Sequence, residues 1–321
     1  MTLIKNMASI FYALLFRRNK FYCQIELKDT VFKIWIKPSK WLNDNNLQTI
    51  FDDIQTVTIA GQGEKEVPNY GVLQGHKTDL DNRLVTIAYD KATNKPIGFA
   101  AQIFLEVPVK TVIVDVLHLG LVFVDKAFQK KSVVGWLYIL PNLLLLAKRG
   151  FRPIWISNVS QVPCVIGVVA QHYGNVYPNP IEDTQQTEMH KLIFESIMQH
   201  HRSAFGTGEE ATYNSEKQII FDSYTGGSDN LKKTFEESAK YRNDLVNTFC
   251  ETNLDYNRGD DFVQIGRLSR HLIHVFCKKN FRGFNLKWAS YLCVAGVFEA
   301  ILTVAYPLDI NNWRDTEGVS L

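Results

Sequence analysis

Hydrophobic and polar residues alternate with a period of two along residues 30–37 (TVFKIWIK), where Phe32, Ile34 and Ile36 fall on one face. Such alternation is typical of a β-strand with one buried face. From Trp41 to Ile54 the apolar residues recur every three or four positions instead, which predicts an amphipathic helix. A strand followed by a helix is therefore expected near the start of the chain.

The next stretch carries the most regular strand patterns of the chain. Residues 83–89 (RLVTIAY) and 97–105 (IGFAAQIFL) are apolar and rich in branched side chains, and the DKATNKP segment between them suits a tight connection. We expect these two runs to form a hairpin, with residues 111–124 as a third strand. From 128 to 148 the apolar spacing becomes helical.

A second strand and helix pair follows. Residues 153–157 (PIWIS) predict a short buried strand, and residues 162–173 predict a helix that ends at Gly174. The order strand, strand, strand, helix, strand, helix predicts a layered α/β fold with a mixed sheet flanked by helices. Beyond Pro180 the pattern becomes α-rich, with helices expected at 187–201, 231–249, 267–278 and 286–306 and loops at 206–227 and 253–261.

These patterns divide the chain into three parts. Residues 1–75 form an N-terminal extension of helix, strand and helix that completes the core, and its first helix contains the apolar run from Ala8 to Phe16. Residues 76–185 form the mixed α/β core. Residues 186–321 form an α-rich C-terminal portion that packs onto this core.

Composition favours a folded protein of the reducing cytoplasm. The 321 residues are 46% hydrophobic, which is enough to bury a substantial core. The net charge of +2 provides no overall attraction to nucleic acid. The five cysteines include no C-x-x-C pair, which argues against a disulfide framework or a zinc site, and we expect no metal.

One segment leaves a membrane alternative open. Residues Trp288 to Tyr306 are nineteen in number and interrupted by a single charge, Glu299, so their length just reaches a bilayer span. A carboxylate near the centre of a span costs about 2–3 kcal/mol on insertion scales. A buried core helix and a membrane contact through this segment are therefore both considered.

The candidate chemistry lies where the strand at 111–124 runs into the helix that follows. Such a junction leaves main-chain N–H groups without partners, and the helix N-terminus adds a positive dipole, so the junction can bind phosphate. The sequence from Leu117 to Gly135 reads LHLGLVFVDKAFQKKSVVG.

This junction resembles the coenzyme A motif of the GCN5-related N-acetyltransferases. In that family a hydrophobic strand ending in valine is followed, five residues later, by Q/R-x-x-G-x-G/A, and here Val124 stands five residues before Gln129. Residues 95–100 (KPIGFA) resemble an earlier strand of the family. The family's two small residues are replaced by Ser132 and Val134, so the motif is degenerate.

The resemblance implies a donor whose pantetheine arm lies against a bulged strand and whose pyrophosphate lies on the helix N-terminus. The donor is then acyl-CoA, or an acyl-carrier protein whose pantetheine depends less on the phosphate loop. The implied donor-binding residues are Leu121, Val122, Phe123, Val124, Gln129, Lys130, Lys131, Ser132, Val133, Val134, Gly135 and Asn158.

Attack of an amine on a thioester requires the amine to be neutral, and hence a base near the thioester. His118 lies six residues before Val124, at the position where histone-modifying members of the family carry a glutamate base. An imidazole can do the same work. The alternative is a buried histidine bonded to a neighbouring carbonyl, and Asp115 is the second candidate.

The expected function is direct transfer of an acyl group from a pantetheine thioester to a small amine, in the cytoplasm. Two other classes remain open: a catalytically silent binding module with the same fold, and a membrane-attached acyltransferase that acts on long-chain substrates. No G-x-x-x-x-G-K-[ST], G-x-S-x-G or H-E-x-x-H string is present, which argues against P-loop nucleotide hydrolysis, a typical serine hydrolase and a zincin.

Overall fold

The computed structural model describes residues 5–6, 8–10, 12–13, 21–63, 67–129, 133–272 and 275. Its helices are α2 (Asp44–Gln62), α3 (Val133–Lys148), α4 (Pro163–His172), α5 (Glu188–His200) and α6 (Asp244–Asn253). Its strands are β1 (Tyr22–Leu27), β2 (Thr30–Ile36), β3 (Arg83–Asp90), β4 (Pro96–Val109), β5 (Val112–Val124), β6 (Ile154–Ser160), β7 (Gly174–Tyr177), β8 (Thr212–Asn214), β9 (Ile219–Phe221) and β10 (Asp261–Leu268).

All of these strands belong to one mixed sheet. Its order is β1-β2-β3-β4-β5-β6-β10-β9-β8, with β7 paired to β10. Strands β1 to β5 form an antiparallel meander. The crossover through α3 then makes β6 parallel to β5, as a strand, helix and strand unit requires, and β10 returns antiparallel to β6.

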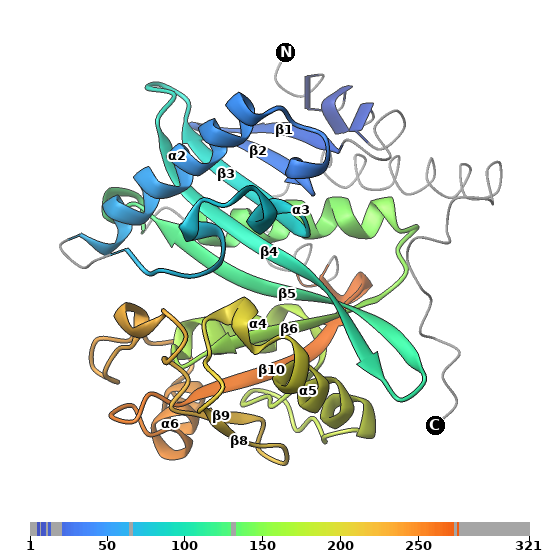
Figure 1. The fold of residues 1–321 in the computed structure, drawn as a ribbon, viewed down its shortest axis with the longest axis vertical. Coiled ribbons are helices and arrows are strands. Elements are labelled where there is room, and N and C mark those ends of the chain that lie inside the picture. The colour runs from blue at the N-terminus through green and yellow to red at the C-terminus, as the bar shows by residue number, and fades with distance from the viewer. Residues whose placement is uncertain are drawn as a thin grey trace.

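Helices cover both faces of the sheet. Figure 1 shows α2 in front of the strands of the N-terminal half and α3 behind them. The α3 face buries the leucine-rich side of that helix together with Val169 of α4 and Tyr173, which directly follows α4. The α2 face buries Leu47, Ile50 and Ile54 against β3 and β4. The mixed sheet flanked by helices confirms the predicted fold class.

Several predicted elements match closely. The hairpin of β3 and β4, the long strand β5, the helix α3, the short strand β6 and the helix α4 lie where the patterns placed them. Pro141 predicts a kink or a division of this helix, but α3 runs past it as one element. Strand β5 is followed by α3 as predicted, but not directly, because a 3-10 turn at Lys126–Phe128 lies between them.

Beyond Pro180 the helix expected at 187–201 is present as α5, but three strands there were not expected. Strands β8 and β9 lie in the expected loop at 206–227, and β10 lies mostly between the loop expected at 253–261 and the helix expected at 267–278. Helix α6 starts at Asp244 and not at 231. Because β10 is buried on both faces between β6 and β9, its residues lack the alternation of a half-buried strand.

The domain boundaries at 75 and 185 remain predictions. Strands from all three predicted parts share the one sheet. Within the described residues no helix is both long and apolar enough to cross a membrane. The segment Trp288 to Tyr306 lies outside the described residues.

Candidate functional site

Strands β5 and β6 are hydrogen-bonded to each other over a short stretch, where residues 116–118 pair with residues 155–157. Farther along, residues 121–124 pair with β4 and residues 158–160 pair with β10. The strands therefore diverge toward their carboxyl ends, as Figure 1 shows. We call this region, residues 119–124 of β5 and 158–160 of β6, the split. Within the described residues, the facing edges of the split have no strand partner, although the carbonyl oxygens of Gly120 and Val124 accept hydrogen bonds from the side chains of Tyr138 and Gln129.

A β-bulge begins the split. Leu119 and Gly120 of β5 together oppose the single residue Gln102 of β4, because Ala101 pairs with Leu121 and Ile103 with His118. Gly120 has a φ of 60°, and a Cβ there would lie 2.2 Å from the carbonyl oxygen of Ala101, so the bulge requires glycine. The hydroxyl of Tyr138 on α3 donates to the carbonyl oxygen of Gly120 at 3.2 Å.

The side chains of the predicted donor strand pack into the two cores. Leu121 and Phe123 lie on the α2 side, where Phe123 stacks on Phe99 at 5.7 Å between ring centroids. Val122 and Val124 lie on the α3 side. Only main-chain groups of this strand thus face the split, which is what contact with an extended pantetheine arm requires.

Helix α3 begins beside the end of β5. The N–H groups of residues 133–135 lie in the first turn of the helix, where N–H groups have no carbonyl partner within the helix. A Cβ at Gly135 would meet no atom within 4 Å, so there is open space at this turn. The Nε2 of Gln129 donates to the carbonyl oxygen of Val124 at 3.2 Å. Lys130, Lys131 and Ser132 lie outside the described residues.

His118 occupies the last paired position of β5 before the split. Its Nδ1 lies 3.0 Å from the hydroxyl of Ser157, and its ring packs 5.4 Å from that of Phe205. The side chain is buried, and burial, followed by the charge of Arg83, lowers its pKa to about 3. The ring is therefore neutral near pH 7 and binds an additional proton weakly.

Asp115 lies three residues earlier on the same strand, so its side chain leaves the sheet on the face opposite to His118. Its carboxylate is 4.0 Å from the guanidinium of Arg149, at the end of α3. The structure does not bring the two predicted catalytic residues together.

Asn158 lies on β6 at the start of the split and is 5% exposed. Its Nδ2 donates to Oε1 of Gln264 on β10 at 3.2 Å. The Nε2 of Gln264 in turn donates to the carbonyl oxygens of Ile166 and Pro178. Asn158 therefore ties β6 to its neighbours, and a contact with a donor remains a prediction.

Several buried polar side chains, contributed by separate elements, interact electrostatically with one another. Tyr70, which precedes the 3-10 turn at 71–74, interacts with Arg83 of β3 and Asp261 of β10. Tyr138 and Tyr224 both interact with Tyr70. Burial raises the pKa of all three tyrosines and lowers that of Arg83 to about 10. We call Tyr70, Arg83, Tyr138, Tyr224 and Asp261 the polar cluster.

Asp261 is the member of this cluster that titrates near neutral pH. It is 3% exposed, and burial raises its pKa to about 7, while hydrogen bonds from Ser223 and Tyr224 partly oppose that shift. Perturbed titratable groups gather at functional sites more often than elsewhere. Within the described residues no group of three or more His, Cys, Asp and Glu side chains could hold a metal ion.

The solved structures that are similar to part of this chain include two proteins described as acetyltransferases. A ribosomal-protein-S5-alanine acetyltransferase from Vibrio fischeri shares 12% identity over 44% of this chain and 74% of its own, with a TM-score of 0.30. A possible acetyltransferase from Clostridium difficile 630 shares 16% identity over 33% of this chain and 66% of its own, with a TM-score of 0.23. No protein-family model and no curated protein matches the chain.

The sequence pattern does not indicate Asp261 as a site residue, because it predicts a loop at 253–261 and acidic residues in loops are ordinarily solvated. One signal was present in the sequence. Asp260 and Asp261 stand directly before the apolar run FVQIGRL, and an acid that starts a buried strand has no solvent beside it.

Proposed function

We propose that this chain transfers an acyl group from a pantetheine thioester to an amine, with the thioester held in the split between β5 and β6. The observation that supports the proposal is the combination of a β5 edge that has no strand partner after the Gly120 bulge with the first turn of α3 close to the end of β5. An extended amide-bearing arm can pair with the strand edge, and its phosphates can lie on the helix N-terminus.

The chemistry requires few protein groups. The amine nitrogen attacks the thioester carbon, the C–N bond forms and the C–S bond breaks. The ammonium form of the acceptor must first lose one proton to a base, and the nitrogen loses a second proton that finally reaches the thiolate. The donor proposed is acyl-CoA or an acyl-carrier pantetheine, and the acceptor is a small amine.

Gly135 offers a test of the donor position. Glutamate there adds a negative charge to the first turn of α3, which favours the helix but repels a pyrophosphate. Glutamine has the same size without the charge, and both side chains enter open space. We expect Gly135→Glu to weaken acetyl-CoA binding by roughly tenfold or more relative to Gly135→Gln.

Calorimetric titration of the two variants and the unmodified chain makes the measurement. Equal affinities for the two variants, or no heat with either acetyl-CoA or a loaded acyl-carrier protein, would remove the donor site from this junction. Donor binding without transfer to any amine would instead favour the alternative of a catalytically silent binding module.

A further inference from the structure

We propose that Arg83 and Tyr70 bind a carboxylate of the acceptor, which is then an amino acid or another small amine that carries a carboxylate. The role of this carboxylate in the reaction rests on the proposed acyl transfer. Its binding to the two side chains can be measured without any transfer.

Arg83 is a charged side chain inside the fold with few partners. It is 7% exposed, and although burial lowers its pKa to about 10, the guanidinium stays positive near pH 7. Its Nε donates to the carbonyl oxygen of Asp79 at 2.5 Å. Among the described residues, no carboxylate forms an ion pair with Arg83 and neither of its Nη atoms donates a hydrogen bond.

The nearest acid does not fill this vacancy. The charge of Asp79 favours the charged form of Arg83 from a distance, but its carboxylate accepts from the N–H of His76 at 3.0 Å. A buried charge without a bonded partner is costly. A guanidinium in this state is therefore suited to bind an anion that comes from outside the fold, and its planar Nη groups match a carboxylate.

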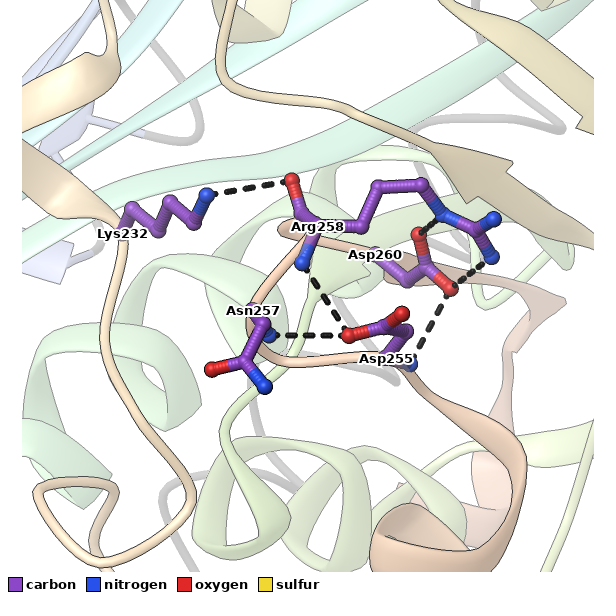
Figure 2. A network of polar contacts seen from close by, with 5 residues as sticks. All are labelled: Lys232, Asp255, Asn257, Arg258 and Asp260. Atoms are coloured by element: carbon purple, nitrogen blue, oxygen red, sulfur yellow. Dashed lines mark hydrogen bonds and ion pairs between the residues drawn. The ribbon is translucent and has the colours of Figure 1, made fainter.

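Other arginines of the chain obtain their partners within the fold. Arg258 donates from Nε and Nη2 to the two oxygens of Asp260 at 2.7 and 2.8 Å, and Figure 2 shows this two-point contact. Arg202 instead donates to a set of carbonyl oxygens, those of Met198, Gly208, Glu209 and Ala211. Arg83 has neither arrangement, so its single bond to a carbonyl does not account for a guanidinium at this position.

The hydroxyl of Tyr70 is a second donor beside Arg83. Tyr70 is buried and interacts electrostatically with Arg83, and burial raises the pKa of its hydroxyl, which is therefore protonated near pH 7. In the part of the chain that the structure describes, this hydroxyl has no hydrogen-bond partner. A Cβ at Gly71 would lie 2.9 Å from Nη2 of Arg83, so a larger residue there would crowd the guanidinium. A carboxylate can accept from the guanidinium and from the hydroxyl together.

The register of the sheet aligns Arg83 with the start of the split. Arg83 of β3 pairs with Ile103 of β4, and Ile103 pairs with His118 of β5. His118 is the last residue of β5 that pairs with β6. The main chains at Arg83 and His118 are two strand spacings apart, or about 10 Å. The charge of Arg83 contributes to the lowered pKa of His118.

The side chains of Arg83 and His118 leave the sheet on the same face. Val85, two residues after Arg83, belongs to the core on the α2 side, so Arg83 also leaves the sheet on that side. Leu117 packs on the α3 side, so its neighbour His118 leaves the sheet on the α2 side. An acceptor bound to Arg83 through its carboxylate can therefore extend its amine across β4 toward the thioester.

Calorimetric titration of the full chain, with and without saturating coenzyme A, tests this site before any transfer. The probes are the standard amino acids, β-alanine and 4-aminobutyrate, each compared with its carboxamide. We expect at least one acid to bind roughly tenfold or more tightly than its amide, because the amide leaves the guanidinium without a charged partner. This comparison needs no variant.

Three variants assign the preference to the two side chains. Arg83→Gln should remove the preference for the acid, and Arg83→Lys, which keeps the charge but not the planar group, should keep part of it. Tyr70→Phe keeps the ring and should reduce the preference by roughly threefold, since one hydrogen bond is lost. Lys110→Gln removes an exposed positive charge in the turn between β4 and β5, and this matched control should keep the full preference. Circular dichroism identifies any variant that fails to fold.

In an assay with acetyl-CoA or a loaded acyl-carrier protein, the preferred acid should have a lower KM than its amide, and Arg83→Gln should raise that KM more than it lowers kcat. Equal binding of every acid and its amide would overturn the carboxylate site, as would a preference that persists in Arg83→Gln or is unchanged in Tyr70→Phe. Transfer to amines without preference for the acids would also overturn it and leave the proposed function standing. If no amine is acylated, the proposed function fails, while the titrations still decide whether Arg83 and Tyr70 bind a carboxylate.

Discussion

Replacing Asp261 with asparagine should remove a pH-dependent loss of stability that the carboxyl imposes on the native protein. Its pKa is raised from 3.8 to about 7 by burial, so between these values the folded chain binds more protons than the unfolded chain. The free energy of unfolding therefore falls as pH rises through this window, and the loss is complete above pH 7. Asparagine has nearly the same shape and can still accept the Tyr224 hydroxyl.

The magnitude follows from the pKa difference of about 3 units. Each unit corresponds to about 1.4 kcal/mol, so the carboxyl costs up to about 4 kcal/mol above pH 7 relative to acid. Urea unfolding of the unmodified chain and of Asp261→Asn between pH 4 and pH 8 measures this cost. The variant should gain stability relative to the unmodified chain as pH rises, with most of the gain between pH 5 and pH 7.

Asp222→Asn is the matched control, because Asp222 is exposed and close in the fold to the same segment. It should leave the pH dependence unchanged. Parallel stability curves for Asp261→Asn and the unmodified chain would refute the reasoning, since they would mean that Asp261 ionises in the folded protein as readily as in the unfolded one.

Three other changes probe the split. Gly120→Ala should lower the free energy of unfolding by about 2 kcal/mol or more, because the residue has a positive φ and its Cβ would clash with the carbonyl oxygen of Ala101. Urea unfolding measures this loss, and an unchanged midpoint would contradict the bulge. Tyr138→Phe should lower the free energy of unfolding by about 1 kcal/mol or less, since one hydrogen bond to Gly120 is lost. If the split holds the donor, the same variant should change the affinity for acetyl-CoA that calorimetry measures. His118→Asn should leave the acid limb of the transfer rate near its original pH, because the imidazole pKa of about 3 lies below that limb; a displaced limb would restore His118 as the base.

Most elements from β2 to α4 could be predicted because they obey simple periodicities, whereas strands β1 and β7 were not expected. Strand β2 is half buried, so Phe32, Ile34 and Ile36 alternate with residues of the other face. The hairpin of β3 and β4 is marked by its polar turn. Helix α3 has the predicted helical spacing, although Pro141 does not divide it as a proline inside a helix predicts. Local pattern and tertiary structure agree in each case.

The C-terminal strands could not be predicted because their burial depends on distant parts of the chain. Strand β10 pairs with β6, about a hundred positions earlier, and carries Gln264 at a fully buried position. That glutamine is satisfied by Asn158 and by two carbonyl groups, which no local pattern reveals. Tertiary pairing therefore decides an element that lies mostly between the loop expected at 253–261 and the helix expected at 267–278.

Part of the candidate site could likewise be predicted from the sequence, and part could not. The β5 to α3 junction is a local feature, and both its strand and its helix could be located from the sequence. Whether a side chain at that junction can serve as a base depends on its burial and its partners. His118 lies in a buried, neutral environment beside Ser157, whereas Asp261 enters the polar cluster only because β10 lies next to β6.

Hydrogen–deuterium exchange of the full chain, with and without saturating acetyl-CoA or a loaded acyl-carrier protein, tests the central claim most directly. A thioester held in the split should slow exchange in peptides that cover residues 119–124 of β5 and the first turn of α3 at 133–136. Peptides from β1 and β2, on the far side of the sheet, should be unchanged. Exchange that stays the same across the split while the donor is bound, or that slows only in other segments, would contradict the placement of the thioester between β5 and β6.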